Sequence, residues 1–418
     1  MTDTTSTTGT GPSAHTRPGY VATVVTAACV IAMIGFGLRS SLGLFLEPMT
    51  EARDWSRATF SLALAIQNLF WGLGLPLAGI LADKFGPTRV ILFGAVIYAL
   101  GLFGMAIAEA PLFLHLTAGA ITGTGIAFTA FTLALAAMAR VVSPARRSLA
   151  LGLGTSAGSL GQVIFSPLGQ AFISAYGWQE TLIIFVAISA TIIPFAFILP
   201  GVGGATGGGQ SLVEQAEQTI SEALREAFAH KGYILLTIGF FVCGFHVAFM
   251  TVHLPAYVLH VGLPPEVGAY CLALIGLFNI IGSFGAGAVG QRFAKRKSLA
   301  VIYLARAVAI VGLLIAPKTE LTLYLFAAAM GLLWLSTVPL TTGIVAQIFG
   351  VRYMATLFGI VFLSHQLGSF TGVYLGGALY DQFGSYDPIW HASIAFGVLA
   401  AVVHWPIDER PLARLSPA

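Results

Sequence analysis

Arg39 lies inside the first long apolar run of the chain, which covers residues 20–46. A helix would place Arg39 roughly 12 Å from Glu47 at the end of this run, because each residue adds about 1.5 Å. An arginine at that depth in a bilayer costs at least a few kcal/mol and lies too far from the helix end to reach water easily. Such a residue usually faces a water-filled cavity and binds an anion. Neutralisation by helix carbonyls is the alternative.

Other polar side chains interrupt the apolar runs further along the chain. Histidine titrates near neutral pH, so His246 and His365 could exchange a transported proton. Amides such as Asn279 could bind a polar substrate, although interhelical hydrogen bonds explain buried amides equally often. Aromatic residues could line a cavity, although most of them pack in the core. The candidate substrate-binding residues are Arg39, Gln67, Asn68, Phe128, His246, Asn279, His365 and Gln366.

Metal, cofactor and enzyme sites are not expected. His246, His253 and His260 recur every seven residues, but along a helix they would lie about 10.5 Å apart, too far to share one ion. The three cysteines lie in apolar runs without paired spacing, as small buried residues do. The chain lacks G-x-S-x-G, H-E-x-x-H and Walker patterns, so we predict neither an enzyme nor a cofactor.

The composition excludes a soluble globule. Of the 418 residues, 57% are hydrophobic and 9% charged, against about 25% charged residues in soluble proteins. We therefore expect an all-α polytopic membrane protein, and the small net charge of +3 gives no reason to expect a nucleic-acid partner. Twelve segments are long enough to span the lipid bilayer, at 20–46, 58–81, 88–108, 112–138, 148–173, 180–200, 233–258, 267–290, 299–316, 320–347, 354–379 and 389–406.

The positions of the basic residues predict the orientation of these spans. If the N-terminus is cytosolic, only Arg53, Arg57 and Lys318 fall in outer loops, and the other basic residues outside the spans fall in inner loops and tails. Arg39 and Arg306 remain within the membrane, and we interpret Arg306 as structural. The polar residues 1–18 lack the features of a signal peptide and are predicted to be a disordered cytosolic tail, with a second cytosolic tail at 407–418.

Residues 201–232 are predicted to connect two six-helix bundles, one over 19–200 and the other over 233–406. The glycine-rich stretch 201–209 is typical of a flexible linker. The segment that follows, 211–228, opens with the capping-box pattern Ser211-Leu-Val-Glu214 and has apolar residues at helical spacing. This pattern predicts an amphipathic helix on the cytosolic membrane face. A regulatory or partner-binding role for the segment is the alternative.

The two halves are related by an internal repeat of 207 residues. The matching pairs are Gly37 and Gly244, Pro48 and Pro255, Gly152 and Gly359, Gly161 and Gly368, Gly169 and Gly376, and Gly177 and Gly384. Because both halves begin on the cytosolic side, the repeat is parallel, and a substrate site is expected between the halves near the bilayer midplane. The same spacing relates Arg39 to His246. We therefore expect these two residues at matching depths on opposite sides of one cavity.

The end of the second span carries the most specific motif in the chain. It reads Gly79-Ile-Leu-Ala-Asp83-Lys84-Phe85-Gly86-Pro-Thr-Arg89 and closely resembles the signature between helices two and three of the major facilitator superfamily. The resemblance implies two pseudo-symmetric six-helix bundles. It also implies a conformational-switch role for Gly79, Asp83, Lys84, Gly86 and Arg89. The equivalent loop at 287–297 keeps basic residues but has no aspartate.

A narrower resemblance rests on the first and eleventh spans. Residues 37–49 read GLRSSLGLFLEPM, residues 54–57 read DWSR, and residues 363–372 read LSHQLGSFTG. Over essentially the whole chain, the sequence is similar to the bacterial form of the monocarboxylate and oxalate–formate transporter branch. This implies a monomer in a bacterial inner (cytoplasmic) membrane that carries a small organic anion, often with a proton. Branch members typically have an arginine on helix eight one turn after an acidic or amide residue. Here Asn279 fits the amide position, but Ser283 stands in place of the arginine.

We therefore predict a secondary active transporter of a small organic anion, a mono- or dicarboxylate, that uses alternating access and proton coupling. Arg39 would bind the anion with help from Asn279 and His365, and His246 or His365 would carry the proton. An exporter of drug-like or amphipathic compounds is the first alternative. Such exporters usually rely on an intramembrane carboxylate, whereas every Asp and Glu here falls in a tail, a loop or a helix end. A non-transporting membrane sensor is the remote alternative.

Overall fold

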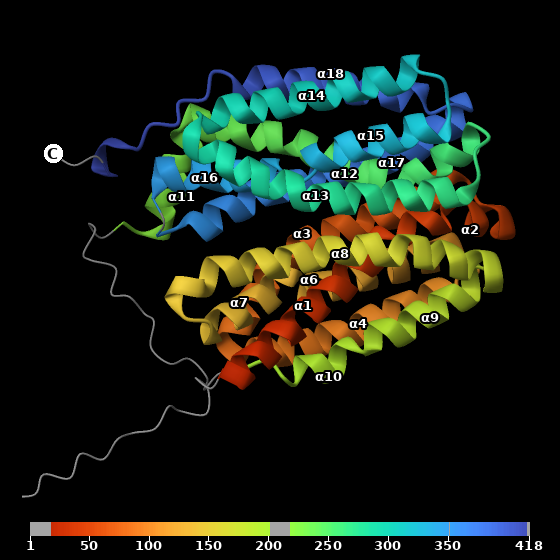
Figure 1. Cartoon of the computed structure of the whole chain (residues 1–418), viewed down its shortest axis with the longest axis horizontal. Helices are drawn as coiled ribbons and strands as arrows, with labels where there is room; N and C mark the ends of the chain where they lie inside the picture. The colour runs from red at the N-terminus through yellow and green to blue at the C-terminus, as the bar shows by residue number, and fades with distance from the viewer. Residues whose placement is uncertain (1–17, 201–217, 351, 416–418) are drawn as a thin grey trace, which may run out of the picture.

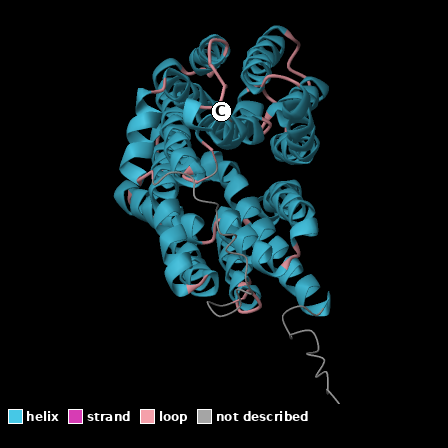
Figure 2. Ribbon diagram, turned by 90° about the vertical axis from the view of Figure 1, so that its left-hand side faces the viewer, coloured by secondary structure: helices cyan, strands magenta, loops and turns pink. Residues whose placement is uncertain are grey.

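The computed structural model describes residues 18–200, 218–350 and 352–415, and every regular element in these ranges is a helix. The helices form two bundles, which lie one above the other in Figure 1. We name the two ends of the molecule the α11 side and the α2 side, after the helices found there. Figure 2 looks at the α11 side and shows many of the helices end-on. The predicted tail at 1–17 and the linker residues 201–217 lie outside the described residues.

The first bundle consists of six spanning segments, several of them interrupted by short turns. Its elements are α1 (Pro18–Ser40), the 3-10 turn η2 (Leu42–Phe45), α2 (Leu46–Arg53), α3 (Arg57–Phe85), α4 (Pro87–Ala106), α5 (Pro111–Leu114), the π-helical turn η3 (His115–Ile121), α6 (Thr122–Phe128), α7 (Phe131–Val141), α8 (Pro144–Tyr176), α9 (Trp178–Ala190) and α10 (Ile192–Ala196).

The second bundle follows a short helix, α11 (Ile220–Ala229), and repeats the six-segment plan. Its elements are α12 (Lys231–His260), α13 (Pro265–Arg292), α14 (Lys295–Ile315), α15 (Glu320–Leu333), α16 (Thr337–Phe349), α17 (Met354–Phe383) and α18 (Asp387–His404). The C-terminal segment ends in the 3-10 turn η5 (Ala413–Leu415). The all-α, two-bundle fold predicted from the sequence is confirmed.

Eleven helical segments within the described residues are long and apolar enough to cross a membrane. The predicted span at 148–173 is not in this set; it is α8, whose 33 residues are more than long enough. Its residues Ser159, Gln162, Ser166 and Gln170 are at most 7% exposed. Because α8 packs against both α1 and α13, these polar side chains face protein and are shielded from lipid.

The internal repeat is visible where the first and fifth spans of each bundle cross. A Cβ at Gly161 would overlap the backbone of α1, and a Cβ at its repeat partner Gly368 would overlap the backbone of α12. From the other side of each crossing, a Cβ at Gly37 or Gly244 would meet the backbone of α8 or α17. Only glycine lets helix backbones approach this closely. The repeated glycines therefore set two equivalent helix crossings.

The motif after α3 forms a tight turn into α4. Gly86 has a φ of 87°, a backbone conformation that favours glycine. The corresponding residue of the second half is Phe293, whose φ of −123° is ordinary extended backbone, so that turn is built differently. The side chain of Asp83 lies outside the described residues. The switching role of the motif therefore stays a prediction.

α11 begins later than the predicted amphipathic helix. Thr219 and Glu222 form a capping box, each accepting a hydrogen bond from the other's backbone N–H. The predicted cap at 211–214 lies outside the described residues. Glu226 of α11 forms an ion pair of 2.9 Å with Arg414, which joins the end of the linker to the C-terminal segment.

Arg306 of α14 binds the backbone at the break between α15 and α16. The first of these helices ends at Leu333, and the buried Arg306 guanidinium donates hydrogen bonds to the carbonyl oxygens of Leu333 and Trp334. A cation at the carbonyl end of a helix offsets the helix dipole and satisfies acceptors that lack a partner within the helix. These contacts support the structural interpretation of Arg306.

Candidate functional site

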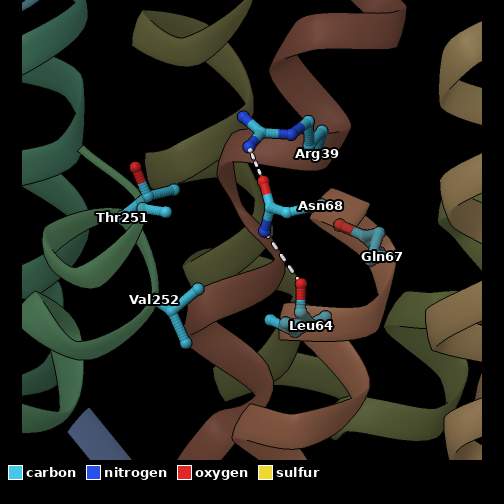
Figure 3. Close-up of a pocket in the computed structure, with 7 residues that line it drawn as sticks. Arg39, Leu64, Gln67, Asn68, Thr251 and Val252 are labelled. Carbon is cyan, nitrogen blue, oxygen red and sulfur yellow. Dashed lines mark hydrogen bonds between the residues drawn. The ribbon is translucent and has the colours of Figure 1, made fainter. Parts of the chain in front are cut away.

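A small cavity lies between the two bundles (Figure 3). The first bundle contributes its residues Arg39, Leu64, Gln67 and Asn68, and the second contributes Ala248, Thr251 and Val252. The cavity has a volume of about 10 Å³ available to water centres, which is room for about one water molecule. Arg39 lies near the middle of the span Gly19–Arg53. The repeat predicted a site between the halves at this depth.

Arg39 is held in place by α3. Its Nη2 donates a hydrogen bond of 2.8 Å to Oδ1 of Asn68 (Figure 3), and its guanidinium lies 4.4 Å from the ring centre of Trp71. The Nε of Arg39 is buried and has no hydrogen-bond partner. Within the described residues, no carboxylate forms an ion pair with Arg39. A guanidinium with a spare donor beside a cavity is able to bind an anion.

A chain of hydrogen bonds leads from Arg39 across the interface between the bundles. The backbone oxygen of Asn68 accepts a hydrogen bond of 3.0 Å from Nε2 of Gln366 in α17. Oε1 of Gln366 in turn lies 3.0 Å from Nδ1 of His365. The His365 ring is buried and stacks on Phe362 at a centroid distance of 5.5 Å. Four of the predicted site residues thus lie in one network, and their role in substrate binding stays a prediction.

Gln67 and Phe128 both belong to the first bundle, but only Gln67 reaches the cavity. The side-chain amide of Gln67 donates a hydrogen bond of 2.9 Å to the carbonyl oxygen of Ala118. Phe128 packs edge to face on Phe93, with ring centres 5.5 Å apart, and does not line the cavity. In this conformation Phe128 is a packing residue, and its role as a substrate contact stays a prediction.

Asn279 lies at a different crossing, where α13 meets α8. Its Nδ2 donates a hydrogen bond of 2.9 Å to Oγ of Ser159, and its Oδ1 accepts from the backbone N–H of Leu335 at 3.0 Å. The hydroxyl of Ser283 also donates to this oxygen, at 3.2 Å. The amide therefore has three hydrogen-bond partners and does not line the cavity. The expectation that Asn279 assists Arg39 is not met in this conformation.

His246 does not share the cavity with Arg39. Its side chain is fully buried, and its Nε2 lies 2.8 Å from the carbonyl oxygen of Ser393 in α18. The repeat places Arg39 and His246 at equivalent positions, but α12 turns His246 toward α18, whereas α1 turns Arg39 toward α3. The prediction that the two residues line one cavity is therefore wrong for this conformation. The spacing of two residues along the chain determines their depth in equivalent helices, but it does not determine which neighbouring helix each side chain contacts.

Contacts that the sequence did not predict close the interface on the α2 side. Asp381, near the end of α17, accepts hydrogen bonds from the backbone N–H groups of Arg57 at 3.1 Å and Ala58 at 2.7 Å, the first two residues of α3. The Arg57 guanidinium pairs with Glu47 and donates a hydrogen bond of 2.8 Å to Oη of Tyr386. A carboxylate at a helix N-terminus offsets the helix dipole. We call these five residues the α2-side clamp.

His253 continues the α2-side clamp toward the cavity. Its ring nitrogens lie 3.3 Å from Oγ of Ser61, 2.9 Å from the carbonyl oxygen of Val373 and 3.3 Å from Oη of Tyr386. The only signal for His253 in the sequence was its membership of the seven-residue histidine series. Its three partners come from distant segments, which spacing cannot identify. In the ranges that the structure describes, no group of His, Cys, Asp and Glu could hold a metal ion.

The hydrogen bonds and ring contacts between α3 and α17 lie in the half of α3 that is nearer the α2 side. From the clamp they continue through Asn68 and Gln366 to the rings of Trp71 and Phe362, which are 5.6 Å apart. Beyond this pair, toward the α11 side, no hydrogen bond or ring contact joins the described residues of the two helices. The crossing of α8 and α13 extends further, to Gly152. In this conformation the interface is closed on the α2 side.

The chain matches the model of one protein family, the Major Facilitator Superfamily, over residues 27–370 and 286–418. Monocarboxylate transporter 13 of Rattus norvegicus is 25% identical over 389 residues, which cover 91% of this chain and 89% of that protein. The uncharacterized MFS-type transporter YcxA of Bacillus subtilis (strain 168) is 24% identical over 386 residues, with coverage of 87% and 90%.

Solved structures share the fold. The crystal structure of a D-xylose-proton symporter matches with a TM-score of 0.74 at 13% identity, and the match covers 94% of this chain and 100% of that one. At this identity the likeness supports the fold alone. The family match agrees with the two repeated helical bundles and with the cavity that both bundles line. This chain is a membrane transporter that belongs to the major facilitator superfamily and resembles the monocarboxylate transporters.

Proposed function

We propose that this transporter moves a small organic anion, a mono- or dicarboxylate, by alternating access and together with a proton. Arg39 carries the proposal, because its guanidinium lies beside the central cavity with a spare donor and without a carboxylate partner among the described residues. Burial of an uncompensated charge at this depth is costly, and an anionic substrate would offset that cost. Relatives named monocarboxylate transporters support the same substrate class.

The anion would bind Arg39 through the donors that now face Asn68. Replacing the neutral amide oxygen with a carboxylate adds an opposite charge on the acceptor side and allows a bidentate ion pair with the guanidinium. Gln67 and Thr251 supply further polar groups to the lining. The cavity of about 10 Å³ is too small for an organic anion. We therefore infer that the cavity enlarges to admit the substrate as the two bundles move apart during the transport cycle.

His365 is the preferred candidate for proton coupling. It is linked to Arg39 through Gln366 and Asn68, so its protonation would add a positive charge to the network that binds the anion. The charges of an incoming anion and an incoming proton would then offset each other, which favours joint transport. His246 is the second candidate, because its contact with α18 places it outside this network.

In this proposal the α11 side is cytosolic. The basic run Lys295–Lys297 and the start of α1 lie there, as the positive-inside rule requires for an N-terminus in the cytosol. Both termini would be cytosolic in a bacterial inner membrane, and the structure would represent the inward-facing stage of the cycle. We also propose that the protein works as a monomer, since a single chain lines the cavity from both sides.

Ligand binding to the purified protein tests the anion site. Small carboxylates are added to wild type, Arg39→Gln and Arg39→Lys in detergent, with cationic and neutral compounds of similar size as controls. A ligand present at about 100 times its Kd stabilises the folded state by about 2.7 kcal/mol. We expect this stabilisation for one or more carboxylates, its loss in Arg39→Gln and a partial effect in Arg39→Lys, which keeps the charge but loses the bidentate fork.

Uptake into proteoliposomes tests the coupling. An inwardly directed proton gradient should accelerate carboxylate uptake by wild type and by His246→Gln, but not by His365→Gln. Full uptake by a folded Arg39→Gln protein would refute the anion site. Stabilisation by cationic or amphipathic compounds alone would favour the exporter alternative. Equal acceleration of all three proteins would leave the anion site standing and remove His365 from the coupling mechanism.

A further inference from the structure

The second bundle contains a groove that the proposed transport cycle does not use. It lies between α13, α14 and the α15–α16 segment, which are neighbours in Figure 1. Its volume is about 400 Å³. Exposed apolar side chains form its walls, among them Val289, Phe293, Val301 and Leu332. We call it the α13–α14 groove.

The groove exists because two neighbouring helices leave space. Along α13 the groove begins at Gly282, where the helix packs against the backbone of Leu332, and continues past Ala286 and Val289. On the opposite wall, the helix interrupted after Leu333 resumes at Thr337, so this wall is not continuous. The buried side chains of Ser336 and Leu340 form the floor. From Gly282 to Val289 the groove extends roughly 10 Å along the axis of α13, which suits part of an extended acyl chain.

A single charged residue, Lys297, lines the groove at its end on the α11 side. The two preceding basic residues are engaged elsewhere: Lys295 donates to Oε1 of Gln347, and Arg296 donates to the carbonyl oxygen of Trp405. Lys297 is exposed, and no hydrogen bond or ion pair joins its side chain to the described residues. The groove therefore combines an apolar channel in the membrane region with one available cation at the level of the helix ends.

We propose that the α13–α14 groove binds an anionic phospholipid, with an acyl chain in the apolar channel and the headgroup phosphate at Lys297. The ligand has to be amphipathic, because apolar walls and a terminal cation occur in one groove. Basic positions at helix ends beside membrane leaflets recognise anionic lipid headgroups. The leaflet on the α11 side supplies the lipid, and the site is separate from Arg39 and the central cavity.

Lipid titration of the purified full-length protein tests this site. Phosphatidylglycerol and phosphatidylcholine with the same acyl chains are added, and bound lipid is counted by native mass spectrometry. We expect tighter binding of phosphatidylglycerol by wild type, and a loss of about fivefold in Lys297→Gln, the effect of one basic residue near an anionic lipid surface. Lys297→Arg should retain the affinity. Lys231→Gln removes a lysine from the same side but outside the groove, and should change nothing.

A second variant tests the acyl-chain channel. Ala286→Phe narrows the groove and should weaken the binding of both lipids, provided that size-exclusion chromatography shows a folded protein. Equal affinities of wild type and Lys297→Gln for phosphatidylglycerol would overturn the proposal. So would equal binding of the two lipids by wild type, because the groove would then lack headgroup recognition. Since Lys297 is exposed, its substitution should leave the fold intact. The two comparisons of lipid affinity therefore test the proposal even if Ala286→Phe does not fold.

Discussion

Removing the carboxylate of Asp381 should favour conformations that are open on the α2 side. This carboxylate joins the two bundles by accepting two backbone hydrogen bonds at the start of α3, from Arg57 at 3.1 Å and Ala58 at 2.7 Å. The bonds exist only while the two bundles touch there. Their loss therefore changes the free-energy difference between closed and open states and leaves each bundle intact.

The magnitude follows from the number and exposure of these bonds. Hydrogen bonds to charged groups contribute about 1.5–3 kcal/mol each, and a carboxylate at a helix N-terminus adds about 0.3–1 kcal/mol. The low ends of these ranges sum to about 3 kcal/mol, and because solvent screens the exposed Asp381 we reduce the total to about 2 kcal/mol for Asp381→Ala. Asp381→Asn keeps an acceptor and should lose about 1 kcal/mol. These values correspond to increases of about 30-fold and about fivefold in the ratio of open to closed protein.

A cysteine at position 61 reports this ratio. Ser61 is fully buried between the bundles, so a maleimide reaches Ser61→Cys only when the α2 side opens. Cys29 is half-buried and is replaced by serine in every variant. The labelling rate should rise about 30-fold with Asp381→Ala and stay unchanged with Asp387→Ala, which removes a carboxylate from the first turn of α18. Identical rates in all variants would refute the assignment of Asp381 to the clamp.

Two further predictions concern the packing and the linker. Gly244→Ala places a Cβ against the backbone carbonyl of His365, which cannot move aside. The protein should lose about 1–3 kcal/mol of stability, measured as a lower thermal unfolding temperature in detergent. As a control, Gly79→Ala has open space at the Cβ position and should leave this temperature unchanged or slightly higher. The Arg414 hydrogen bond lowers the pKa of Glu226, so this pair stabilises the docking of α11 at neutral pH and loses its effect as the pH falls below about 4. Arg414→Gln should therefore accelerate hydrogen exchange in α11 relative to wild type at pH 7 and not at pH 3, and an equal acceleration at both pH values would contradict this account.

The fold could be predicted because its causes recur along the chain. Span length, the placement of basic residues and the 207-residue repeat are each visible in many positions, and Gly161 and Gly368 mark the same crossing twice. The span at 148–173, which is α8, was identified from its length and apolar residues, and the repeat marks its glycines as well. For the site, Arg39 and Asn68 were each identified as polar residues within apolar runs. Their direct hydrogen bond was not predicted, since sequence periodicity does not pair helices.

The α2-side clamp could not be predicted for a related reason. Asp381 and Arg57 are 324 positions apart in the chain, and each resembles an ordinary charged residue at a helix end. Their contact depends on how the two bundles meet, and no local pattern encodes that arrangement. The placement of His246 was wrong because the repeat fixes its depth in the helix but not its neighbour, which proved to be Ser393.

The two halves share a backbone plan but not a distribution of charge. Glycines such as Gly37 and Gly244 recur because both bundles need the same close helix crossing, and any larger side chain would separate the backbones. A binding site between the bundles is needed only once. Nothing therefore requires Arg39 and its repeat equivalent, His246, to face the same cavity. One half contributes a permanent cation to the cavity, whereas its equivalent in the other half is a histidine bound to α18. A single uncompensated cation at the interface attracts an anion, whereas two would repel each other across a region of low dielectric constant. The departure from symmetry at this position therefore supports Arg39 as the substrate-binding residue.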